Sequence, residues 1–225
     1  KKLQDPEVLR QVVRIMLRSD RSVDFAESFV EQWLHTRELS GDKAPDAKLF
    51  PDLAKDEDLR SDIRYQPILF FREVFLQNLS LLNFLDSDHS IGTRKLATHF
   101  GLKLALRPNQ TSQPHWIPLP ENSNRGGLLG MPAVLTVSSY PYRTSPVLRG
   151  AWVMEALLGT PPPPPPANVP PLDESAPGGT ARTVRERLDL HRTNAVCASC
   201  HTRIDPYGFA LENYDVTGRW RDEDA

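Results

Sequence analysis

Several features that would identify common classes of protein are missing from this sequence of 225 residues. No apolar run approaches the ~18–20 residues that a helix needs to cross a bilayer, so we expect no transmembrane segment. The net charge is only −2 at pH 7, which gives no indication of a nucleic-acid-binding surface or of an acidic tail. The opening residues lack the apolar stretch of a secretory signal peptide. Cysteine is nearly absent too, with two residues in the whole chain.

These two cysteines carry the most informative motif of the sequence, Cys197-Ala198-Ser199-Cys200-His201. Two cysteines three positions apart and followed directly by a histidine have the C-x-x-C-H spacing of a covalently attached c-type haem. In such a site both thiols add across vinyl groups of the porphyrin, and the histidine lies beneath the iron. The sequence therefore predicts one covalent haem c, bound by Cys197 and Cys200, with His201 as the proximal iron ligand.

Two other interpretations of the cysteine pair have less support. A C-x-x-C redox disulfide belongs at the start of a βαβ unit, and no such unit is visible in the sequence. A zinc site needs two further cysteine or histidine ligands. His191 and His201 could supply them, but the chain has no second C-x-x-C and no H-x₃₋₅-H spacing.

The ligand on the other face of the iron is left open by the sequence. Small cytochromes c usually take it from a methionine downstream of the motif, and here no methionine or histidine follows His201. Three arrangements remain. An upstream residue folds over the distal face, for which His191 and Met131 are the candidates; a tyrosine such as Tyr207 lies near; or the iron is five-coordinate and open.

These arrangements separate the possible functions. Six-coordinate iron with fixed ligands suits electron transfer, which we expect because most isolated haem c modules shuttle electrons. An open distal site would instead permit peroxidase-like catalysis or ligand sensing, with His99 and His115 as candidate acid/base groups. A haem that only stabilises the C-terminal part of an interaction protein is a further alternative.

Hydrophobic periodicity predicts a mainly α fold. Helices are expected over residues 6–17, 22–39, 57–78, 81–86 and 91–100, the third kinked or split at Pro67. Short strands are expected at residues 115–118 and 134–137, and helices at 146–157 and about 180–191. Asp205-Pro206-Tyr207-Gly208 is expected to form a turn.

A run of six prolines at residues 161–166 indicates a polyproline II segment. Because a helix is expected on each side of it, we expect this segment to be a stiff spacer. The alternative is a docking ligand for an aromatic groove. We therefore expect an N-terminal helical domain with a few short strands at residues 1–159. A proline-rich linker at 160–179 joins it to a cytochrome c-like lobe that binds haem c at 180–225. Because haem c is attached outside the bacterial cytoplasm, we expect an exported protein, seen here as a piece of a longer chain.

Several stretches resemble one known group of proteins. They are Arg143–Gly150, Trp152–Gly159, the proline run, and Cys197–Asp215. The chain is similar to large cytochrome-containing proteins of planctomycetes and related bacteria, which carry domains of unknown function 1592 (here about Phe25–Gly159) and 1588 (about Arg143–Arg221). The resemblance implies a multidomain haem protein of the periplasm or cell exterior. It also implies that the partners are a redox protein or other domains of the same polypeptide or complex.

Overall fold

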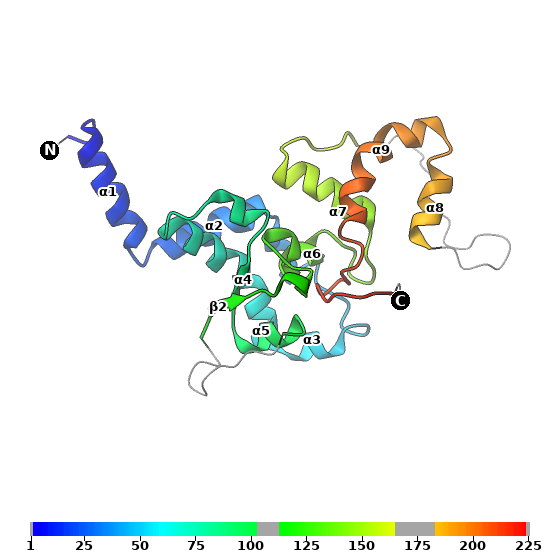
Figure 1. The fold of residues 1–225 in the computed structure, drawn as a ribbon, viewed down its shortest axis with the longest axis horizontal. Coiled ribbons are helices and arrows are strands. Elements are labelled where there is room, and N and C mark those ends of the chain that lie inside the picture. Colours follow the sequence, from blue (N-terminus) through cyan, green and yellow to red (C-terminus); the bar gives the residue numbers. More distant parts are fainter. Residues whose placement is uncertain (1, 103–112, 165–182, 224–225) are drawn as a thin grey trace.

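The computed structural model describes residues 2–102, 113–164 and 183–223. Within these residues the fold is mainly helical, with one small antiparallel sheet, as the sequence predicts (Figure 1). The α-helices are α1 (Pro6–Arg18), α2 (Ser22–Trp33), α3 (Pro51–Lys55), α4 (Glu57–Leu76), α5 (Arg94–His99), α6 (Pro132–Val137), α7 (Pro146–Trp152), α8 (Val184–His191) and α9 (Ala195–Phe209). The strands are β1 (His89–Gly92) and β2 (His115–Pro118), and 3-10 turns lie at η1 (Thr36–Ser40), η2 (Leu81–Phe84), η4 (Glu121–Ser123) and η5 (Leu128–Gly130).

Helix α1 forms where predicted. Asp5 caps α1 by accepting a hydrogen bond from the amide of Glu7, and Pro6 takes the first helical position. In Figure 1, α1 extends from one end of the molecule, and none of its residues is buried. Helix α2 ends at Trp33, short of the predicted end at residue 39: His35 has a positive φ of 60°, and the chain continues as the 3-10 turn η1. No helix in the described ranges is long and apolar enough to span a membrane.

The predicted interruption at Pro67 does not divide α4, which the structure assigns as one helix from Glu57 to Leu76. A proline inside a helix removes one backbone donor and crowds the preceding turn. The helix continues because the residues around Pro67, including Ile63, Ile68 and Phe70, are buried in the protein interior. The burial of these side chains thus outweighs the tendency of proline to interrupt a helix.

In two short segments before residue 140, the prediction of helix or strand is wrong. Residues 91–100 are not one helix, because Ile91 lies in β1, opposite Trp116 of β2, and α5 starts only after the cap residue Thr93. Residues 134–137 are not a strand but the body of α6, which is buried at every position. A short run of buried apolar residues has the same composition in either conformation, so its periodicity could not decide between them.

The main hydrophobic core joins segments from both ends of the chain. Helices α2, α4, α6 and α7 contribute to it, together with Leu211 and Tyr214, which follow α9. Its members include Leu34, Ile68, Phe70, Leu128, Met131, Leu135, Trp152, Leu211 and Tyr214. The C-terminal segment is therefore packed into the body that the earlier helices form. Most of the predicted linker at 160–179 lies outside the described residues.

The predicted helix at 146–157 is confirmed, with an irregularity at its end. It begins as α7 and continues as one π-helical turn, η6 (Val153–Leu157), before Gly159 ends it with a φ of 61°. The predicted turn at 205–208 is wrong, because these residues lie inside α9 with Pro206 as an internal residue. The reason is that α9 packs along α7 through this very segment.

Candidate functional site

The C-x-x-C-H motif lies in the first two turns of α9. Asn194 caps this helix by accepting a hydrogen bond from the amide of Val196. Cys197 and Cys200 are both partly buried free thiols. Since residues three apart in a helix share a face, the two sulfur atoms lie on the same side of α9, one turn apart.

His201 follows on the next position and is held by a second side chain of the same helix. Its ring is only 16% exposed, and Nδ1 lies 2.9 Å from the Oδ1 atom of Asp205. Within the described part of the chain, no protein group hydrogen-bonds to Nε2. A histidine whose Nδ1–H donates to a carboxylate presents the lone pair of Nε2, which is the usual arrangement of a histidine that ligates a metal.

Asp205 is completely buried, with a side-chain exposure of 0%. Its Oδ1 atom faces His201, while its Oδ2 atom has no hydrogen-bond partner. The nearest cation is the guanidinium of Arg192, whose Nε lies 3.8 Å from Oδ2. Asp205 was predicted to lie in a turn, so its contact with His201 was not predicted from the sequence. Its signal was the spacing, four residues after His201, which places both side chains on one helical face.

The two candidates for a distal ligand lie in different places. His191, the last residue of α8, packs against His201 with 5.0 Å between the ring centroids and 75° between the ring planes. The two imidazoles touch, so in this arrangement His191 lies beside His201 and no porphyrin fits between them. Met131 is a member of the main hydrophobic core and is 2% exposed.

Tyr207 lies seven residues after Cys200 and thus on the same face of α9, two turns further along. It is 41% exposed and borders a small cavity together with Met154 of η6. The structure therefore leaves Tyr207 at the surface of the helix that carries the motif.

The candidate acid/base histidines are engaged elsewhere. The Nε2–H of His99 donates to the carbonyl oxygen of Thr217 over 2.7 Å, and Nδ1 accepts from Arg219. Burial lowers the pKa of His99, with a smaller contribution from the charge of Arg219. His115 lies in β2, where its Nδ1 is 2.9 Å from the carbonyl oxygen of Gln113.

Two glycines bring α9 into backbone contact with α7. A Cβ atom on Gly208 would overlap the carbonyl oxygen of Pro146, and one on Gly150 would overlap that of Ile204. Both close approaches are possible only because glycine has no side chain. The helix with the motif is therefore fixed against the protein body by its second half.

Arg149 fixes the chain that follows α9. Its buried guanidinium donates to the carbonyl oxygens of Leu211, Tyr214 and Asp215 at 2.5, 2.7 and 2.9 Å. Burial lowers the pKa of Arg149 to about 9. These hydrogen bonds connect α7 to the C-terminal segment and so add to the attachment of α9.

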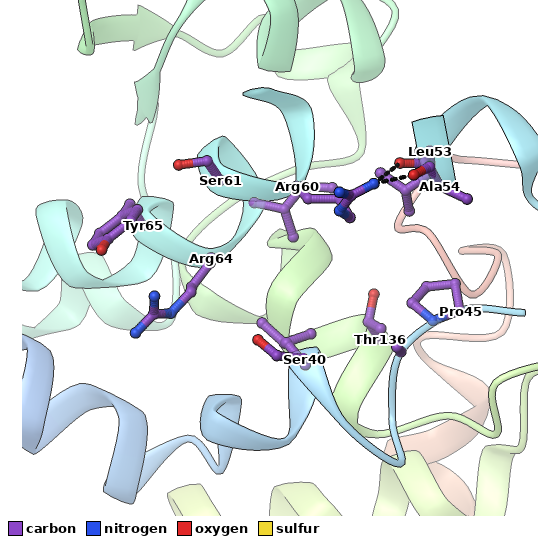
Figure 2. A pocket seen from close by; sticks show the side chains of 12 residues that line it. Ser40, Pro45, Leu53, Ala54, Arg60, Ser61, Arg64, Tyr65 and Thr136 are labelled. Carbon is purple, nitrogen blue, oxygen red and sulfur yellow. Dashed lines mark hydrogen bonds between the residues drawn. The ribbon is translucent and has the colours of Figure 1, made fainter. Parts of the chain in front are cut away.

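A larger cavity of about 460 Å³ lies elsewhere, among η1, α3, α4 and α6 (Figure 2). Figure 2 shows Arg60 at its edge, donating to the carbonyl oxygens of Leu53 and Ala54. Most of its lining is apolar, and no residue of the C-x-x-C-H motif belongs to it. In the ranges that the structure describes, no three histidine, cysteine, aspartate or glutamate side chains are grouped as for a metal ion.

Comparison with known protein families gives two matches that together span most of the chain. Residues 1–102 match PSD4, a protein of unknown function (DUF1592), and residues 125–224 match PSCyt3, a protein of unknown function (DUF1588). The predicted resemblance to these two families is thus confirmed, with the first match ending earlier and the second beginning earlier than expected. No curated protein and no solved structure matches the chain.

Proposed function

Because this chain belongs to the proteins that join a DUF1592 domain to a DUF1588 domain, we propose that it is a haem c-binding module that transfers electrons. Cys197 and Cys200 form the two thioether bonds, and Nε2 of His201 is the proximal iron ligand. The name of the second family, PSCyt3, suggests a cytochrome and agrees with this assignment.

The observation that carries the proposal is the arrangement of the motif on α9. Both thiols are free and partly buried on one side of the helix, and His201 has its Nδ1 occupied by Asp205 while its Nε2 is available. A redox disulfide has no use for a histidine held in this way. A zinc ion does use one, but within the described residues no three histidine, cysteine, aspartate or glutamate side chains are grouped as a zinc site requires. The residues present therefore fit a covalently attached haem.

The chain's own contribution is attachment and orientation. Each thioether forms by addition of a cysteine S–H across a vinyl C=C bond: sulfur bonds to one carbon and the proton goes to the other, so no oxidant is consumed. When bound, the haem supplies a one-electron couple at iron. The contact of α9 with α7 through Gly208 and Gly150 holds the attachment points in a fixed position.

The second candidate function is peroxidase-like catalysis or ligand sensing at a haem with an open distal side. The observation that favours it is the placement of the two candidate distal ligands: His191 lies against His201 on the same side, and Met131 is enclosed in the core. Five-coordinate iron would bind small ligands or react with peroxide. In either case we propose that the module is exported to the periplasm or cell exterior and works with a redox partner or with other domains.

An absorption spectrum distinguishes these functions. The chain is produced in a bacterial host that attaches haem c, and spectra are recorded oxidised, dithionite-reduced, and reduced with carbon monoxide. Sharp reduced α and β bands that carbon monoxide does not change support a six-coordinate electron carrier. A high-spin spectrum that responds to carbon monoxide supports the open site instead. The matched control is the double variant Cys197→Ser/Cys200→Ser, in which a Soret band should be lost.

A further inference from the structure

We infer that Asp205 is a positioning residue for the proximal histidine: it fixes the proton of His201 on Nδ1 and strengthens Nε2 as an iron ligand. This inference rests on the proposed function, since it concerns how a haem bound at His201 would be tuned. It names a residue outside the C-x-x-C-H motif as part of the same site.

The first support is the rigidity of the contact. His201 and Asp205 are one helical turn apart on α9, and their Nδ1 and Oδ1 atoms are 2.9 Å apart. Ile204, next to Asp205, and Gly208, three residues after it, are the residues at which α9 meets the backbone of α7. Because the helix is fixed there, the carboxylate stays in reach of the imidazole without help from solvent.

The second support is the cost of burying this carboxylate. Asp205 is 0% exposed, and Oδ2 makes no hydrogen bond. The guanidinium of Arg192, at 3.8 Å, is beyond hydrogen-bond distance from Oδ2 and is also paired with Asp189 on the protein surface. Burying a carboxylate costs free energy, and one hydrogen bond with a cation at 3.8 Å offsets little of that cost, so Asp205 is a poor stabilising element of the fold. Its one hydrogen bond within the described residues goes to His201, so the contact with this ring accounts for its presence.

The chemical consequence follows from the character of the acceptor. A carboxylate that accepts the Nδ1–H of a ligating histidine makes the imidazole a stronger electron donor than a neutral acceptor would. A stronger donor stabilises the oxidised iron more than the reduced iron and so lowers the reduction potential. The hydrogen bond also excludes the tautomer that carries its proton on Nε2, which cannot bind iron through that atom.

The ring of His191 adds a second restraint. It contacts His201 edge to face, so rotation of the His201 ring away from Asp205 would have to displace the end of α8. The imidazole of His201 is thus held by the hydrogen bond at Nδ1 and by packing against the ring of His191.

The test compares the full chain with its Asp205→Asn variant, both carrying covalent haem. Asparagine has nearly the same shape but no charge, so the helix contact is kept and the donor effect is removed. We expect the haem content per chain to be unchanged and the reduction potential to rise. With an open distal side the reduced iron is five-coordinate, and its Fe–histidine stretching frequency should then fall as well. Asp205→Glu, which keeps a carboxylate on the same face, should restore part of the shift.

Asp189→Asn is the matched control. Asp189 lies on α8, is 54% exposed and pairs with the same Arg192. Because its carboxylate does not contact His201, the reduction potential and the stretching frequency should stay at the wild-type values. If Asp205→Asn carries haem with an unchanged potential and stretching frequency, the inference is overturned while the proposed function stands. If the wild-type chain carries no covalent haem, the proposed function itself fails.

If Asp205→Asn does not fold, a measurement on the wild-type protein tests the role of Asp205. The measurement uses diamagnetic iron: the reduced protein itself if its haem is six-coordinate, or its carbon monoxide complex if the distal side is open. In that state the Nδ1–H proton of His201 should exchange slowly with water, because its acceptor is buried. A rapidly exchanging Nδ1–H in a chain with covalently bound haem would contradict the role of Asp205.

Discussion

Gly208 of α9 lies so close to Pro146, the first residue of α7, that a Cβ atom on the glycine would overlap the proline's carbonyl oxygen. The opposite glycine, Gly150 of α7, meets the carbonyl oxygen of Ile204 in the same way. The helix that carries the C-x-x-C-H motif is therefore joined to the protein body by two contacts in which backbone meets backbone. The position of the thiols depends on residues far from them in the sequence.

Replacing Gly208 by alanine should weaken this contact. The added methyl group meets backbone atoms of Pro146, which cannot move aside as a flexible side chain would. Overpacking of this kind typically costs about 1–3 kcal/mol, and we expect the free energy of unfolding to fall by at least this much. Urea denaturation followed by circular dichroism measures the change.

Gly130→Ala is the matched control for this prediction. A Cβ on Gly130 would be 3.4 Å from the nearest atom, which is an ordinary van der Waals contact. Its stability should stay within about 0.5 kcal/mol of the wild type. Equal stability of Gly208→Ala and Gly130→Ala would show that α9 does not meet α7 as described.

Arg149→Met should destabilise the protein strongly. Arg149 donates to three backbone carbonyl oxygens of the segment after α9, and methionine leaves all three without a donor. A buried acceptor without a partner costs about 1–3 kcal/mol, so we expect a loss of about 3 kcal/mol or more. Thermal and urea unfolding measure it, with the exposed Arg14→Met as a control that should change little. A loss below 1 kcal/mol would contradict the role assigned to Arg149.

His99 should make stability fall in mild acid. Burial lowers its pKa in the folded protein, so below the unfolded value of 6.5 the unfolded chain takes up a proton that the folded chain does not. Stability is therefore complete above about pH 6.5 and decreases as the pH falls toward the lowered pKa. Urea unfolding at about pH 7.5 and about pH 5 should show a smaller difference for His99→Gln than for the wild type. A His99→Gln variant that loses as much stability between these two pH values as the wild type would contradict this assignment.

The sequence predicted the helical class and the long helices correctly because their apolar residues recur at helical spacing over several turns. Residues 6–17 and 146–157 are examples. It failed where a segment is short and wholly buried. Val134 to Val137 resemble a strand by their β-branched composition, yet they form α6, since burial on all sides removes the periodic signal.

The site was predicted in part. The motif identified Cys197, Cys200 and His201 directly, because their spacing alone carries the chemistry. Asp205 was not found, since Asp205-Pro206 was taken for a turn, and only the packing of α9 on α7 keeps this dipeptide helical. Arg149 could not be found either, because its acceptors lie more than sixty residues away in the chain.

The central claim is that haem is covalently held at Cys197 and Cys200, and intact mass spectrometry under denaturing conditions tests it most directly. The chain purified from a haem-attaching host should be heavier than its sequence by the mass of one haem, and Cys197→Ser/Cys200→Ser should have the mass of the polypeptide alone. A wild-type chain without added mass, produced in a host that matures a reference cytochrome c in parallel, would contradict the account.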